Sequence, residues 1–141
     1  MLRPYYPGDV WLIVNDLSQQ EIDECKAVGI TPIENIQFGV EHGKTFTLEL
    51  GGEVAGVVGV IRGNGYDIPW SAFNSVVCKH PVEFLRLCKR WVSEQKEPLR
   101  NVVDARHTRA IRWLEWLGFT VGPAEPLGVN GELLHQYWRT P

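Results

Sequence analysis

Hydrophobic and polar positions change their period several times along the chain, and each change predicts an element. Residues 18–29, "SQQEIDECKAVG", place Ser18 and Glu21 at capping-box spacing and end at Gly29, which is typical of a short helix. Residues 45–50, "TFTLEL", then alternate apolar and polar positions, as a half-buried strand does. The expected buried positions of this strand are Phe46, Leu48 and Leu50.

The next two segments continue an antiparallel arrangement. Gly51 and Gly52 form a two-residue turn signal, and the nearly all-apolar run 53–61, "EVAGVVGVI", predicts a central strand covered on both faces. Residues 66–77, "YDIPWSAFNSVV", predict a third strand that ends at Val76 and Val77. Its first half should be irregular, because Pro69 removes one donor from the ladder.

The second half of the chain predicts a parallel crossover. Apolar residues recur at three- and four-residue steps through 81–95, and Pro81 suits the first turn of this helix. A strand follows at 99–105, "LRNVVDA". Strand, helix and strand in this order imply a right-handed parallel connection.

One further helix and two strands complete the predicted order. The helix uses Ala110, Ile111, Leu114 and Leu117 as core positions and stops at Gly118. The terminal strands are "FTVG" and "LLHQYWR", and Asn130-Gly131 is a turn signal before the second. The expected order is strand, helix, three antiparallel strands, helix, parallel strand, helix and a final strand pair. We therefore expect residues 1–141 to form one α/β domain around a mixed, mainly antiparallel sheet.

Composition narrows the function classes. The 141 residues have a net charge of −3, which argues against nucleic acid as the primary partner. The segment 79–112 is locally basic, with nine Lys/Arg against four Asp/Glu. No apolar run is long enough to span a membrane, and no signal-peptide pattern opens the chain, so we expect a protein that is not secreted. Three cysteines without a C-x-x-C pair, and scattered histidines, predict neither a disulfide framework nor a metal site.

The element order and the pattern of Ala110, Ile111, Gly118 and Phe119 resemble the GNAT superfamily of acetyl-CoA-dependent N-acetyltransferases. In that family the last antiparallel strand and the next parallel strand splay apart, and the pantetheine arm of acetyl-CoA lies between them. The resemblance implies a cofactor site near the ends of these strands and the start of the long helix. The residues it implies as cofactor-binding are Val76, Val77, Lys79, His80, His107 and Arg109.

Two departures from the family pattern concern the chemistry. Working members have a glycine-rich loop at the start of the long helix, where main-chain N–H groups hold the pyrophosphate. Here the stretch is "CKHPVEFLR", which has no glycine, and Pro81 has no N–H to give. The usual general-acid tyrosine falls on Leu114, which cannot donate a proton. No catalytic residue is therefore assigned, and the sequence leaves open whether this is an enzyme.

Several polar and aromatic residues near this region have two interpretations. Arg106, Arg109 and Arg112, at steps of three, either hold a phosphate or an acidic partner or form a solvated helix face, which we favour. His107 is a helix cap, a cofactor ligand or a base, and more often such a histidine is structural. Cys78 is a nucleophile or a small buried residue, and we favour the second interpretation.

A more specific resemblance is to the acetyltransferase-like internal virion proteins of short-tailed phages. The stretches that carry it are "ECKAVGI", "IPWSAFNSVV", "FLRLCKRW" and "IRWLEWLGF". This likeness implies a phage-encoded, catalytically degenerate protein that binds protein partners in the virion or in the host cytoplasm. The alternative is an acetyl-CoA-dependent N-acyltransferase that acts on an amine. An open cleft between the splayed strands would favour the enzyme, and a cleft filled by side chains of residues 79–84 would favour the binding protein.

Overall fold

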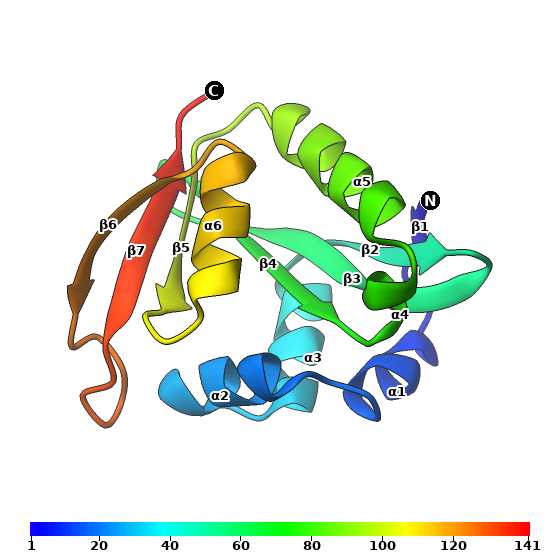
Figure 1. Ribbon diagram of the computed structural model, residues 1–141, viewed down its shortest axis with the longest axis horizontal. Helices are drawn as coiled ribbons and strands as arrows, with labels where there is room; N and C mark the ends of the chain where they lie inside the picture. The colour runs from blue at the N-terminus through cyan, green and yellow to red at the C-terminus, as the bar shows by residue number, and fades with distance from the viewer.

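A computed structural model describes all residues, 1–141, and shows one seven-stranded mixed sheet with helices on both sides (Figure 1). The strands are β1 (Leu2–Pro4), β2 (Gly43–Leu50), β3 (Glu53–Arg62), β4 (Asp67–Phe73), β5 (Leu99–Asp104), β6 (Thr120–Glu125) and β7 (Leu134–Arg139). The helices are α1 (Asp9–Val14), α2 (Gln19–Ala27), α3 (Pro32–His42), α4 (Val76–Lys79), α5 (Pro81–Ser93) and α6 (Thr108–Trp116). This confirms the expected fold class.

The sheet has the order β1-β2-β3-β4-β5-β7-β6, and its only parallel neighbours are β4 and β5. The helix α5 connects these two strands, as the predicted crossover requires. The predicted central strand 53–61 is confirmed as β3, and the long predicted helix is confirmed as α5, which begins at Pro81. The strand 99–105 is confirmed as β5.

Two apolar layers cover the two faces of the sheet. Figure 1 shows α5 and α6 on one side, and α1, α2 and α3 together on the other. Under α5 and α6 the largest buried cluster consists of Cys88, Val92, Leu99, Val103, Leu114, Leu117, Phe119 and Tyr137. Under α1 and α3 a second cluster consists of Val10, Ile13, Ile36, Val57, Trp70 and Ala72. The close approach of α3 depends on Gly39, where a Cβ atom would lie 2.2 Å from the Trp70 ring.

The N-terminal third differs from the prediction. A single strand was expected before the first helix, but β1 has only three residues and the helix α1 follows it. The helix α3 was not predicted either, although Thr31 and Glu34 form a capping box and Pro32 occupies its first turn. The predicted helix 18–29 is confirmed as α2, followed by Gly29 at a φ of 80°.

The strand β2 buries two of its three predicted positions. Leu48 and Leu50 are buried, but Phe46 is exposed and Thr47 is fully buried. The reason is a polar partner, because the Thr47 hydroxyl donates a 2.7 Å hydrogen bond to the carboxylate of Asp9 on α1. Because α1 lies on this face of β2, the polar residue Thr47 is part of the core.

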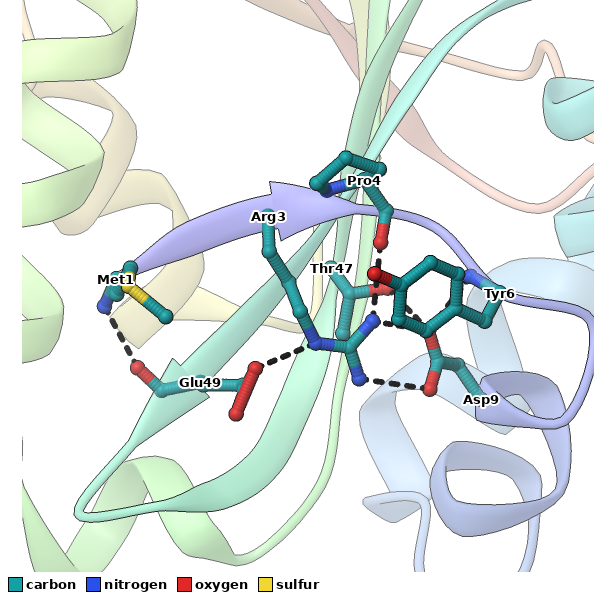
Figure 2. Close-up of polar contacts among 7 residues, drawn as sticks. All are labelled: Met1, Arg3, Pro4, Tyr6, Asp9, Thr47 and Glu49. Carbon is teal, nitrogen blue, oxygen red and sulfur yellow. Dashed lines mark hydrogen bonds and ion pairs between the residues drawn. The ribbon is translucent and has the colours of Figure 1, made fainter.

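A buried ionic cluster joins β1, α1 and β2 (Figure 2). Arg3 donates two 2.9 Å hydrogen bonds to the two carboxylate oxygens of Asp9, and its Nε atom contacts Glu49. The Tyr6 main-chain N–H and the Thr47 hydroxyl also donate to Asp9. Burial alone would raise the pKa of Asp9, but these hydrogen bonds and the Arg3 charge hold that pKa below its usual value.

Removal of the arginine should destabilise the protein strongly. In Arg3→Ala, the Asp9 carboxylate stays buried without its cation, and we expect a loss of about 3 kcal/mol in the free energy of unfolding. Urea denaturation at pH 7 measures this loss. Arg62→Ala is the matched control, because the Arg62 side chain is 82% exposed and lies 4.0 Å from Asp67, so it should cost less than about 1 kcal/mol. Equal losses in the two variants would contradict the role of the cluster.

Candidate functional site

The strands β4 and β5 share one pairing and then separate. Asp67 pairs with Leu99 at their start, and the Asn101 side-chain amide donates to the Pro69 carbonyl just beyond. Toward the carboxyl ends, Phe73 and Asp104, no further pairing joins the two strands. The splayed pair that the family resemblance implies is therefore present.

An open cleft of about 520 Å³ lies at this gap. Ser71 and Phe73 of β4 and Val102 and Val103 of β5 line it, and Tyr137 of β7 also contributes to its wall. Helices and connections close the remaining sides, with side chains of Asp16, Leu17, Ser18, Gln20, Glu21, Glu24, Asn74, Ser75, Val77, Cys78, Phe84, Arg109, Ala110, Trp113 and Leu114. The cleft is not filled by the side chains of residues 79–84.

Only two of the six residues proposed for cofactor binding line this cleft, namely Val77 and Arg109. The predicted end of the third strand was wrong, because β4 ends at Phe73 and the two valines begin the short helix α4. Val76 is buried against Leu48 and other apolar side chains of β2 and β3. The predicted extended valines therefore offer no strand edge to a pantetheine arm.

The other three residues lie outside the cleft lining. Lys79 forms a 3.6 Å ion pair with Glu53 of β3. The His80 ring lies against Gly51 in the β2–β3 turn, where an added Cβ would come within 2.5 Å of it. His107 precedes α6, and its Nε2 atom lies 4.0 Å from a carboxylate oxygen of Asp104 without a hydrogen-bond partner.

Main-chain N–H groups before α5 are already bonded within the protein. The Ser75 N–H donates to the Asp16 carboxylate at 3.2 Å, and the Val76 N–H donates to the Asn74 side chain at 3.0 Å. The Val77 and Cys78 N–H groups donate to carbonyls of Asn74 and Ser75 within the turn. These donors are thus not free for an anion.

Charge at the start of α5 also disfavours a phosphate. Pro81 supplies no donor, and Glu83 places a carboxylate in the first turn. Asp16 adds a second carboxylate at the preceding turn, where its pKa is lowered by hydrogen bonds from Ser75. The residues present therefore do not fit the pyrophosphate of acetyl-CoA in the way that a glycine-rich loop does.

Arg106, just before α6, and Arg109 and Arg112, on α6, have separate environments. Arg106 forms a 2.7 Å ion pair with the buried carboxylate of Asp104. Arg109 lines the cleft, whereas Arg112 is exposed on the helix surface. The three side chains therefore do not converge on one phosphate site.

An aromatic group forms the apolar part of the cleft. Phe84 of α5 stacks on Trp113 of α6, with ring centroids 5.8 Å apart. Phe73 of β4 meets Phe84 edge-on at 4.9 Å and Trp113 edge-on at 6.1 Å. These three rings connect both helices to the end of β4, beside the buried side chain of Leu114.

Sequence analysis missed two acidic residues of the cleft. Glu21 and Glu24 lie one turn apart on α2, and both line the cleft. Burial, with the neighbouring Glu24 charge, raises the pKa of Glu21 to about 8. Burial raises the pKa of Glu24 to about 7, and the Asp104 and Asp23 charges add to this effect. The sequence indicated only that Glu21 could cap its helix.

Tyr137 is a second feature that sequence analysis missed. It lies on β7, is buried, and contributes to the cleft wall near the position where Leu114 replaces the usual tyrosine. Burial raises the pKa of its phenol, and the charges of Glu24 and Glu21 raise it further. It is thus a neutral hydroxyl group over the ordinary pH range.

Cysteines and histidines give no further site. Cys78 is exposed at the cleft, contrary to the favoured interpretation as a buried residue, while Cys25 and Cys88 are buried thiols. No group of three or more His, Cys, Asp or Glu side chains is placed to hold a metal ion. None of the helices has the length and apolar character needed to cross a membrane.

Comparison with known proteins gives matches in structure only, since no protein-family model and no curated protein matches the sequence. A ribosomal-protein-alanine N-acetyltransferase from Brucella melitensis is 12% identical and has a TM-score of 0.69. The match covers 100% of this chain and 99% of that protein. A GNAT-family acetyltransferase from Streptococcus pneumoniae is 13% identical and has a TM-score of 0.64. The match covers 99% of this chain and 98% of that protein.

A third match is the spermidine N-acetyltransferase of Vibrio cholerae in complex with CoA and spermine. It is 15% identical with a TM-score of 0.66, over 99% of this chain and 94% of that protein. Identities this low concern the fold alone. Because the splayed β4–β5 pair and the whole-chain likenesses agree, this protein has the fold of the GNAT acetyltransferases.

Proposed function

We propose that this protein is a GNAT-fold binding protein that has lost the acetyl-CoA phosphate site and uses the remaining cleft to hold a basic group of a protein partner. One observation carries the proposal. The N–H groups that precede α5 are bonded to Asp16, Asn74 and the turn itself. Without these donors, the phosphates of a CoA molecule would lose water without receiving replacement hydrogen bonds.

The proposed ligand follows from the charge of the cleft. Three carboxylic side chains line it, from Asp16, Glu21 and Glu24, whereas Arg109 is its only lysine or arginine. A protonated amine or a guanidinium group complements such a wall, and the aromatic rings beyond it suit the apolar stem of a lysine or arginine. A basic side chain of a partner protein has both parts.

The setting of this partner is inferred from sequence alone. The resemblance to internal virion proteins of short-tailed phages supports a partner in a phage particle or in the host cell. The absence of a tyrosine at Leu114 supports a role without acetyl transfer, because positioned acid–base groups supply about 10²–10⁴-fold in rate.

A second candidate function is acetyl-CoA-dependent transfer to an amine. The open cleft of about 520 Å³ favours it, because the space between the splayed strands is not blocked. The two glutamates and Tyr137 line that space. They would have to replace the missing acid, and the phosphates would have to lie outside the turn before α5.

Acetyl-CoA should bind weakly or not at all. We expect a Kd above about 1 mM by isothermal titration calorimetry at pH 7, because no main-chain cradle holds the phosphates. Arg109→Ala is the matched variant, since this side chain is the one cation of the cleft. Micromolar binding that this change weakens would contradict the proposal and support the enzyme.

A lysine analogue should bind in the cleft. We expect Nα-acetyl-lysine methylamide to change the tryptophan fluorescence of the protein, because Trp113 forms part of the wall. The double variant Glu21→Gln, Glu24→Gln should weaken this binding by about tenfold or more, which corresponds to about 1.4 kcal/mol. The exposed Glu115 of α6 supplies the control, Glu115→Gln, which should bind as the unchanged protein does. Equal affinity in both variants would rule out the acidic wall as the binding site.

A further inference from the structure

The positive charge of the chain is concentrated around α5 and α6. Residues 79–112 contain nine Lys/Arg against four Asp/Glu, whereas the rest of the chain contains five Lys/Arg against 13 Asp/Glu. On α5, Arg86, Lys89 and Arg90 are exposed at three- and four-residue spacings, on the side of the helix away from the buried Cys88. This spacing places the three cations on one solvent-facing surface of the helix.

A contact between the two helices extends this surface onto α6. Arg112 and Trp116 are exposed one turn apart on α6, and Figure 1 shows both helices on the same side of the sheet. The Lys89 Nζ atom donates a 2.6 Å hydrogen bond to the Trp116 carbonyl and lies 4.3 Å from the centroid of its ring. The two helices thus form one exposed surface, here named the basic face, which consists of Arg86, Lys89, Arg90, Arg112 and Trp116.

The arginines of the basic face have no acidic partner in the protein. No ion pair within 4.0 Å involves Arg86, Arg90 or Arg112. Arg106, by contrast, is paired with the buried carboxylate of Asp104. A guanidinium group binds a carboxylate through two parallel hydrogen bonds, so three such groups remain available to an acidic ligand.

The basic face also contains an exposed aromatic ring. The Trp116 residue is 48% exposed, whereas Trp113 on the same helix stacks on Phe84 of α5. Tryptophan and arginine are enriched among the residues that contribute most to protein–protein binding. The cations alone fit a solvated helix face, but a ring among them also offers an apolar contact. The Lys89 ammonium already lies over this ring, so part of the surface is ordered before a ligand binds.

We propose that the basic face binds an acidic segment of a partner protein, with carboxylates on Arg86, Arg90 and Arg112 and an apolar side chain on Trp116. Charge complementarity identifies this class of partner. The surface is separate from the candidate cleft, because none of its five residues lines that cleft. The proposal therefore goes beyond the binding of a basic group and does not depend on it.

The charges around the basic face favour a protein segment over a nucleic acid. Exposed acids flank it, namely Glu83 and Glu94 at the two ends of α5 and Glu115 on α6. A nucleic-acid strand that continued beyond the face would bring its phosphates to these acids and to the acidic remainder of the chain. A short acidic segment of a protein ends within the face and avoids this repulsion.

A defined acidic peptide tests the charge of the basic face. The probe is a short fluorescein-labelled peptide of glutamates with one central leucine, followed by fluorescence anisotropy at pH 7 in low salt. We expect saturable binding that the double variant Arg86→Glu, Arg90→Glu weakens by about tenfold or more. The double variant Lys26→Glu, Lys44→Glu changes the net charge equally at exposed positions of α2 and β2, and should bind within about twofold of the unchanged protein. No binding, or an equal loss in both variants, would overturn the proposal.

The contact with the ring has a test of its own. In Trp116→Ala, we expect binding of the leucine-containing peptide to fall by about threefold or more, because the apolar contact is lost. Binding of an all-glutamate peptide should not change, since that peptide has no apolar side chain to place on the ring. Equal effects on the two peptides would contradict a contact with Trp116. Circular dichroism checks that each variant keeps its secondary structure.

Two other occupants of the basic face give different results. A single-stranded oligonucleotide that bound more tightly than the peptide, and lost binding in Arg86→Glu, Arg90→Glu, would replace the protein segment by a nucleic acid. Sedimentation velocity tests a second copy of this chain, whose remaining surface is acidic. We expect a monomer at all concentrations. A dimer that the same double variant dissociates would overturn the acidic partner in favour of self-association.

Discussion

The separation of β4 from β5 is the constraint on which the rest of the molecule depends. A parallel pair is normally held by evenly spaced hydrogen bonds along its length. Here the pairing is limited to Asp67 and Leu99, and Asn101 supplies one side-chain bond beyond it. The crossover through α5 nevertheless keeps both strands in one sheet, so the gap opens only toward their carboxyl ends. The candidate cleft of about 520 Å³ opens at that gap.

The two ends of the cleft differ in how their polar groups are satisfied. At the turn before α5, Asp16 and Asn74 accept the main-chain hydrogen bonds. The Asp16 carboxylate thus occupies a donor that an anionic ligand would otherwise use. At α2, the carboxyls of Glu21 and Glu24 are half-buried and have no ion-pair partner in the protein. The cleft therefore has bonded main-chain donors at one end and carboxyl groups without an ion-pair partner at the other.

Sequence patterns predicted those elements whose burial follows from the hydrophobic pattern of their own residues. The strand β3 and the helix α5 are examples, because β3 is buried along a continuous apolar run and α5 buries Cys88 and Val92, which are four residues apart. The short helix α1 was missed because it has only six residues, and two of its large apolar side chains, Trp11 and Leu12, are exposed. The burial of Thr47 in β2 was not predicted, because its partner Asp9 is remote in sequence.

The site was less predictable than the fold. Arg109 was expected beside the cleft and lines it, since it is the second residue of the helix that follows the parallel strand. Val76 and Val77 were wrongly assigned to a strand because β-branched residues continue the strand pattern, whereas the Asn74 side chain accepts a hydrogen bond from the Val76 N–H and turns the chain. Glu21, Glu24 and Tyr137 come together only through the tertiary fold, so no local pattern could indicate a shared cleft.

The bonding of the turn before α5 has a consequence for substitutions. Asp16 accepts hydrogen bonds from Ser75, and the Asn74 side chain accepts one from the Val76 N–H, so two separate segments satisfy the donors of this turn. A glycine introduced at Cys78, for instance, would leave the Ser75 and Val76 donors bonded as before, and Pro81 would still lack an N–H. The donors of this turn would become free only if Asp16 and Asn74 also changed. The bonding of this turn is therefore set by two segments that are remote in sequence, and no single substitution at Cys78 changes it.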